Sequence, residues 1–84
     1  MSRTTYVVAP TLPAFVGWAM SSGYKVDCVD GTHPETGHRV RFVSGPGTVK
    51  HLSEGVDFLF LKHWQSRKDW RAIYNRALAI GRRS

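Results

Sequence analysis

The segment 62–71, KHWQSRKDWR, holds the side chains that indicate a chemistry most directly, because it interleaves basic residues with two tryptophans. Lysine and arginine neutralise phosphates and an exposed indole stacks on a base, so this mixture is typical of proteins that bind single-stranded or distorted nucleic acid. Trp64 lies in a predicted turn and is the better stacking candidate, whereas Trp70 falls on a predicted apolar helix stripe. A rim tryptophan half-buried for packing is an equally good interpretation of Trp64.

A second candidate is the turn at residues 44–48, SGPGT, between a predicted strand and a predicted helix. The backbone N–H groups of Gly45 and Gly47, together with the Thr48 hydroxyl, are what an anion needs at the start of a helix. The turn lacks the spacing and the lysine–hydroxyl pair of a Walker A loop, so we do not expect nucleotide hydrolysis. An ordinary tight turn is the alternative, because glycine and proline punctuate most connections.

The positive charge of the chain is concentrated at its C-terminal end. The 84 residues carry a net charge of +6, and basic and acidic side chains cancel over residues 1–61. The whole surplus falls in residues 62–84, where Asp69 is the sole acidic residue. Such asymmetry indicates a polyanion or an acidic protein surface as the partner, the alternative being a solvated helix face that serves solubility. The candidate phosphate contacts are Lys62, Arg67, Lys68, Arg71 and Arg76.

The histidines and the single cysteine form no metal-binding or catalytic pattern. Cys28, His33 and His38 follow one another at five-residue intervals, but three potential ligands on a hairpin fall short of a structural zinc site. His51 and His63 have no serine or carboxylate beside them in a nucleophile pattern. We therefore expect no metal, no cofactor and no enzymatic activity.

The same composition indicates a compartment. One cysteine allows no intrachain disulfide, which fits a reducing cytosol. The longest apolar runs, such as residues 58–61, are too short to cross a bilayer, and the N-terminus lacks a signal pattern. We expect a cytoplasmic protein (in the host cytoplasm, if the chain is viral) without membrane contact, and the sequence leaves its oligomeric state open.

Hydrophobic periodicity predicts an alternating order of strands and helices in the first two thirds of the chain. Residues 4–9 and 25–29 predict strands, separated by a helix that begins at a Thr11 cap and ends near Gly23. Residues 39–44 predict a third strand, which would form an antiparallel hairpin with residues 25–29. A short helix is then expected over residues 48–53.

The last third of the chain predicts a buried strand and an amphipathic helix. Residues 56–61, VDFLFL, are the most apolar, so we expect a central strand buried on both faces. Ser66 offers an N-cap, with Asp69 completing a shortened capping box. The helix should end near Gly81, where Arg82 and Arg83 would complement its carbonyl end. Its apolar stripe is Trp70, Ile73, Tyr74, Ala77 and Leu78.

These elements predict one small α/β domain, residues 1–84. Strands that alternate with helices imply right-handed crossovers onto a mainly parallel sheet with helices on both faces. We expect a Rossmann-like fold of two or three layers, with three helices and about four strands, mostly parallel with one hairpin. In such sheets ligands gather at the carboxyl ends of the strands. The turns at residues 10–11, 44–48 and 62–67 would then share one rim.

Three segments resemble motifs of the superfamily-two helicases. VVAPTLPAF, residues 7–15, resembles the strand and turn of motif Ia, commonly written A-P-T-R-x-L-A, and VSGPGTVKHL, residues 43–52, resembles the later T-P-G-R turn. VDFLFLKHW, residues 56–64, takes the place of the strand that ends in the acidic Walker B box. The resemblance covers about residues 5–64 and implies a RecA-like, helicase-domain-like scaffold. It further implies that Thr11, Gly47 and Thr48 touch a nucleic-acid backbone.

The sequence departs from the helicase pattern at the residues that hydrolyse ATP, so we expect no ATPase activity. No Walker A loop precedes the first strand, Leu12 and Thr48 stand where the family has arginines, and the residues at 62 and 63 are lysine and histidine instead of metal-binding carboxylates. What the resemblance then implies is a fragment of a motor domain used as a passive scaffold, of the kind that a small phage accessory protein would employ.

The sequence as a whole favours a non-catalytic binding module that engages the nucleic-acid backbone through a basic C-terminal helix. Specificity for a base sequence is not expected, because no known base-reading motif is present. The alternative is a small phage-type inhibitor or adaptor whose basic face binds an acidic surface of a host protein.

Overall fold

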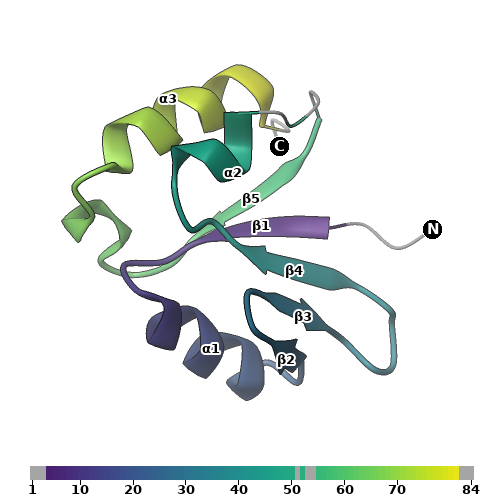
Figure 1. Cartoon of the computed structure of the whole chain (residues 1–84). Coiled ribbons are helices and arrows are strands. Elements are labelled where there is room, and N and C mark those ends of the chain that lie inside the picture. Colours follow the sequence, from purple (N-terminus) through teal and green to yellow (C-terminus); the bar gives the residue numbers. More distant parts are fainter. Residues whose placement is uncertain (1–3, 51, 53–54, 82–84) are drawn as a thin grey trace.

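The computed structural model of the chain describes residues 4–50, 52 and 55–81. Three α-helices, one short 3₁₀-helix and five strands make up a small α/β domain (Figure 1). In chain order the elements are β1 (Thr4–Val8), α1 (Leu12–Ser21), β2 (Lys25–Asp27), β3 (Asp30–Thr32), β4 (Arg39–Phe42), α2 (Pro46–Lys50), β5 (Asp57–Phe60), the 3₁₀-helix η1 (Trp64–Ser66) and α3 (Trp70–Ile80).

The strands form one mixed sheet in the order β2-β3-β4-β1-β5. β1 pairs in parallel with both β4 and β5, whereas β3 pairs antiparallel with both β2 and β4. The prediction of about four, mostly parallel, strands is therefore wrong. Half of the strand pairs are antiparallel, and they occupy one side of the sheet.

The unpredicted strand is β3, which lies in a segment rich in turn residues. A two-residue turn folds β3 back onto β2, with Cys28 in the left-handed region at φ 56°. The predicted direct pairing of residues 25–29 with residues 39–44 is also wrong, because β3 lies between the two strands. Three residues with no apolar alternation carry too little pattern to be recognised as a strand.

Helices cover both faces of the sheet, which gives the domain three layers (Figure 1). α1 lies on one face, and α2 and α3 lie together on the other. The core on the α1 side includes Val7, Phe15, Ala19, Val40 and Phe42. The core on the α2–α3 side includes Val8, Val43, Val49 and Ile73.

β1, and not β5, is the strand buried on both faces. Val7 and Val8 are both fully buried and belong to the two opposite cores. β5 lies at the edge of the sheet and pairs only with β1 among the described strands, so the prediction of a central strand over residues 56–61 is wrong. Its apolar residues instead join an aromatic cluster beside α3, and Leu59 stays 36% exposed.

The ends of α1 confirm the predicted capping. Thr11 is the N-cap, and its hydroxyl accepts a hydrogen bond from the backbone N–H of Ala14 at 3.3 Å. Gly23 adopts φ 89° just after the helix, and the following Tyr24 N–H donates to the carbonyl of Ala19 at 2.9 Å. The left-handed glycine thus ends the helix and turns the chain into β2.

The start of α3 differs from the prediction. Ser66 lies in η1, and the N-cap of α3 is Asp69, whose side chain makes no capping hydrogen bond. The carboxylate of Asp69 is held instead by Arg67. An ion pair therefore takes the place of the expected capping box.

The buried stripe of α3 is also narrower than predicted. Ile73, Ala77 and Ile80 are buried, whereas Tyr74 and Leu78 are 37% and 54% exposed. The helix ends at Gly81, as expected, and Gly81 forms an isolated parallel bridge with Val56 at the start of β5. Arg82 and Arg83 lie outside the described residues.

Candidate nucleic-acid interface

The three turns expected to share a rim do meet at the carboxyl ends of β1, β4 and β5. Arg67, in the turn after β5, donates hydrogen bonds to the carbonyl oxygens of Ala9 at 3.3 Å, of Ser44 at 3.0 Å and of Val43. Ala9 follows β1, and Val43 and Ser44 follow β4. One guanidinium therefore joins all three connections.

Arg67 is committed to the interior of the protein. Its side chain is 8% exposed, and both its Nε and its Nη2 lie 2.9 Å from the carboxylate oxygens of Asp69. The guanidinium carbon lies 5.6 Å from the centre of the Phe42 ring. Because all five donors of an arginine are limited to one planar fork, these bonds leave little to offer a ligand. We therefore do not count Arg67 among the cations available to a phosphate.

Arg76, on α3, has a similar internal role. Its Nε donates to the carbonyl of Val49 at 3.2 Å, and its Nη2 donates to those of Lys50 at 3.1 Å and Leu52 at 3.4 Å. These carbonyls lie at and just after the C-terminal end of α2, where the last carbonyls of a helix lack partners within the helix, and that of Val49 also accepts from the backbone N–H of Leu52 at 3.3 Å. Arg76 thus ties α2 to α3, and its charge compensates the carbonyl end of the short helix.

The polar groups of the candidate turn at residues 44–48 form hydrogen bonds with one another. The hydroxyls of Ser44 and Thr48 lie 3.0 Å apart in a hydrogen bond, and the backbone N–H of Thr48 donates to the carbonyl of Gly45 at 3.0 Å. Gly47 is exposed in the first turn of α2, and the Thr11 hydroxyl is used as the cap of α1. The structure brings these residues to one rim, with both threonine hydroxyls already hydrogen-bonded.

Three of the predicted cations remain free on the surface. Lys62, Lys68 and Arg71 are exposed, and none of them has an ion pair or a side-chain hydrogen bond to the described residues. The guanidinium carbon of Arg71 lies 5.3 Å from the centre of the Trp70 ring, a cation–π distance. These cations surround the turn and the first turn of α3.

Aromatic rings belong to the same segment as these cations. The ring centres of Trp64 and Trp70 are 5.7 Å apart in an edge-to-face arrangement, and Tyr74 lies 5.5 Å from Trp64. Phe60 supports Trp64 from β5 at 4.6 Å. Both tryptophans are half-buried, so each keeps part of its ring accessible. We call Trp64, Trp70 and Tyr74, together with Lys62, Lys68 and Arg71, the aromatic–basic surface.

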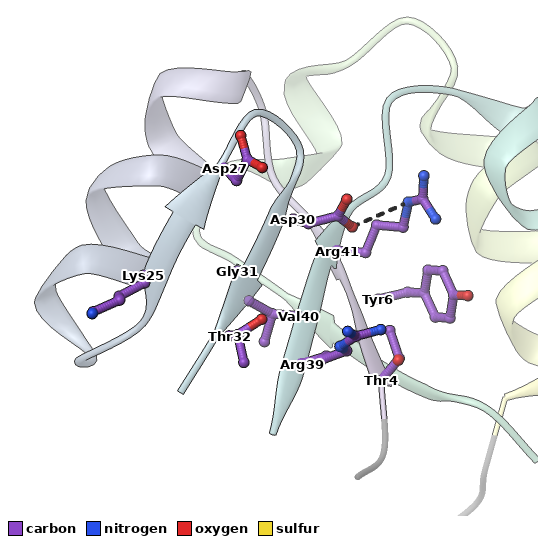
Figure 2. A pocket seen from close by; sticks show the side chains of 10 residues that line it. All are labelled: Thr4, Tyr6, Lys25, Asp27, Asp30, Gly31, Thr32, Arg39, Val40 and Arg41. Carbon is purple, nitrogen blue, oxygen red and sulfur yellow. Dashed lines mark ion pairs between the residues drawn. The ribbon is translucent and has the colours of Figure 1, made fainter. Parts of the chain in front are cut away.

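A second polar feature, which the sequence did not reveal, lies on the sheet itself. A pocket of about 360 Å³ opens on the face of β2, β3 and β4 and is lined by side chains of four strands (Figure 2). Its charged residues are Lys25, Asp27, Asp30, Arg39 and Arg41. The alternation of Arg39-Val40-Arg41-Phe42 hints at a polar strand face, but the grouping depends on β3, which the sequence did not show.

The histidines hold turns together. Nδ1 of His33 accepts from the backbone N–H groups of Glu35 at 3.2 Å and Thr36 at 3.4 Å, and Nε2 of His38 lies 2.9 Å from the Thr5 hydroxyl. His63 is exposed with φ 66°, and His51 lies outside the described residues. Across the part of the chain that is described, no three His, Cys, Asp or Glu side chains group closely enough to hold a metal ion.

No protein-family model, curated protein or solved structure matches this chain. The resemblance to helicase motifs thus stays a prediction. None of the described helices combines the length and the apolar character needed to span a membrane.

Proposed function

We propose that this chain is a non-catalytic module that binds single-stranded nucleic acid through the aromatic–basic surface. The observation that carries the proposal is the contact of the Arg71 guanidinium with the half-buried ring of Trp70, which also packs on Trp64. Lys62 and Lys68, exposed and unpaired within the described residues, each lie two positions before one of these tryptophans in the chain. Cations neutralise phosphates, and ring faces accept any base. The binding is therefore expected to show little dependence on base sequence.

The interface that we propose is shorter than the whole basic helix. Arg76 is bonded to α2 and Arg67 to the rim, so the ligand would contact the turn after β5 and the first turn of α3. The charge of Arg76 still adds to the local field, whereas that of Arg67 is compensated by the carboxylate of Asp69. A strand of only a few nucleotides would fill this surface.

Charge neutralisation is tested with the double variant Lys62→Gln/Lys68→Gln. For a single-stranded oligonucleotide, each phosphate contact contributes about 0.7 to the slope of log K against log salt, so the loss of two contacts lowers the slope by about 1.4. Fluorescence anisotropy at several salt concentrations measures it. Lys50→Gln is the matched control, since Lys50 is equally exposed but lies on α2. No detectable affinity of the wild-type protein at low salt, or an unchanged slope in the double variant, would refute the proposal.

Stacking is tested on the unmodified protein, which avoids truncating rings that also pack. The indole N–H resonances of Trp64 and Trp70 should shift on addition of the oligonucleotide, and the tryptophan fluorescence should be quenched. The indole of Trp18, a residue of α1 whose ring contacts those of Phe15 and Tyr24, is the internal control and should not respond. Phosphate-dependent binding without an indole response would show that the rings only support the fold.

A second candidate function rests on the exposed apolar side chains of α3. Tyr74 and Leu78 lie one helical turn apart and are 37% and 54% exposed, next to the cations of the aromatic–basic surface. Apolar area bordered by positive charge also suits an acidic protein surface, the partner of an inhibitor or adaptor. Capture from a nuclease-treated lysate separates the two candidate functions, because a protein partner survives digestion and a nucleic-acid bridge does not.

We propose the cytoplasm as the compartment, because the single Cys28 is an exposed free thiol.

A further inference from the structure

The half of the sheet formed by β2, β3 and β4 presents a polar face above which the structure leaves a pocket (Figure 2). The strand register arranges its side chains in two rows that cross the strands. Lys25 is opposite Thr32, and Thr32 is opposite Arg39, so these three form one row. The second row, by the same pairing, contains Asp27, Asp30 and Arg41.

The second row compensates its charge in part, because it holds two carboxylates and one guanidinium. Nε of Arg41 lies 3.5 Å from a carboxylate oxygen of Asp30, an ion pair drawn as the dashed line in Figure 2. Asp27 is directly opposite Asp30 in the last pair of the β2–β3 hairpin. Like charges directly opposite one another destabilise a sheet, so the guanidinium of Arg41 stabilises this pair of carboxylates by reducing their repulsion. Arg41 is therefore engaged by the protein itself.

The first row has no such compensation. Lys25 and Arg39 are exposed, and neither has an ion pair or a hydrogen bond from its side chain to any residue that the structure describes. Between them stands only the hydroxyl of Thr32, which lines the same pocket. In Figure 2 the side chains of Lys25 and Arg39 extend in opposite directions away from Thr32. The row therefore holds two cations that flank one hydroxyl, with no carboxylate within the row.

From this arrangement we propose that the row Lys25, Thr32 and Arg39 binds a phosphate group. Neighbouring strands are about 4.8 Å apart, so the row spans about 10 Å. The binding that we propose requires the exposed Lys25 and Arg39 side chains to rotate toward Thr32, and they are long enough to meet around one anion over that distance. The planar guanidinium of Arg39 matches two phosphate oxygens, and the Thr32 hydroxyl donates to a third. The phosphate belongs either to a nucleotide or to a nucleic-acid backbone.

This phosphate site is separate from the aromatic–basic surface. Arg39 is the first residue of β4, and the pocket also includes Thr4, the first residue of β1. The aromatic–basic surface follows the carboxyl end of β5, which runs parallel to both strands. The two sites therefore lie toward opposite ends of the parallel strands, so the phosphate site goes beyond the proposed function and can be tested independently.

The experiment is an amide NMR titration of the full chain with three probes, namely inorganic phosphate, adenosine monophosphate and a short single-stranded oligonucleotide. We expect the backbone amides of Lys25, Thr32 and Arg39 to shift saturably. In Arg39→Gln the apparent affinity should fall at least about tenfold, the loss of one charged hydrogen-bonding partner. Lys50→Gln removes the same charge from α2 and should leave the affinity unchanged. Because Arg39 is exposed and unpaired among the described residues, its variant should keep the wild-type spectrum elsewhere.

The outcomes separate the two sources of phosphate. Saturation by adenosine monophosphate or inorganic phosphate assigns the site to a small ligand, and a response to the oligonucleotide alone assigns it to a nucleic-acid backbone. The proposal is overturned if none of the probes shifts these amides, or if Arg39→Gln and Lys50→Gln weaken binding alike, which would indicate general charge attraction. The indole resonances, read in the same spectra, report on the aromatic–basic surface, so failure of one site is distinguished from failure of the other.

Discussion

The Arg67→Gln variant tests whether Arg67 stabilises the fold or binds the ligand. The side chain is 8% exposed and donates to three backbone carbonyls and to the carboxylate of Asp69. Glutamine is too short to reach these partners together and carries no charge, so the variant leaves the carboxylate and the carbonyls of the rim without their donor. We expect a large loss of stability together with a small effect on nucleic-acid affinity per folded molecule.

The size of the loss follows from the burial of the pair. Removing one partner of a buried ion pair costs about 3–5 kcal/mol, and the lower end applies here because Asp69 is 31% exposed and regains some hydration. For a domain of this size, each kcal/mol lowers Tm by about 4–8 °C, so a loss of about 3 kcal/mol lowers it by about 12–24 °C. Arg67→Lys keeps the charge without the planar fork, and its Tm should fall between those of Arg67→Gln and the wild type.

Thermal unfolding followed by circular dichroism measures these shifts, and urea unfolding gives the free energies. Lys68→Gln is the neighbouring control: Lys68 is exposed with no side-chain partner in the described structure, and its Tm should stay near that of the wild type. A Tm of Arg67→Gln equal to that of the wild type, combined with weaker oligonucleotide binding, would refute the reasoning and return Arg67 to the binding surface.

Two other substitutions test the packing that positions the candidate sites. Arg76→Gln removes the donors from three carbonyls at the end of α2 and should cost about 1–3 kcal/mol in urea unfolding, with hydrogen exchange accelerating first in α2. Gly31→Ala places a Cβ 2.9 Å from Cγ2 of Val40, so overpacking should cost about 1–3 kcal/mol, and an unchanged stability would show that β3 can shift away from β4.

The parts of the fold that could be predicted are those with a strong local pattern. α1 was predicted with its Thr11 cap and its Gly23 terminus, because capping chemistry and helical periodicity act within a few residues. The meeting of three turns at one rim was also predicted, since β1, β4 and β5 are parallel and their carboxyl ends lie together. The C-terminus of α3 at Gly81 followed from the same local rules.

The fold predictions were wrong where the structure depends on which strands pair with one another. β3 is too short to show a period, so the sheet was predicted with too few strands and too many parallel pairs. The apolar run of β5 indicated a central strand, yet its aromatic side chains bury themselves against η1 and α3 at the edge. Apolar content alone does not distinguish a central strand, which pairs on both edges, from an edge strand whose apolar side chains pack against aromatic rings.

The candidate site was predictable in its residue types but not in their partners. The basic and aromatic character of residues 62–71 is visible in the sequence. That Arg67 and Arg76 bond internal carbonyls, while Lys62 and Lys68 do not, depends on long-range contacts that no spacing reveals. The row of Lys25, Thr32 and Arg39 likewise exists only through the register of three strands.

The central position of β1 has a consequence for how the chain folds. β1 is synthesised before its neighbours β4 and β5, which come much later in the chain. Closing such long loops is entropically expensive and slows folding relative to a chain of local hairpins. Until residue 60 has been synthesised, Val7 and Val8 lack one of their flanking strands. A nascent chain therefore carries an unprotected apolar segment until β5 has been made, the stage at which chaperone binding or misassembly competes with native pairing.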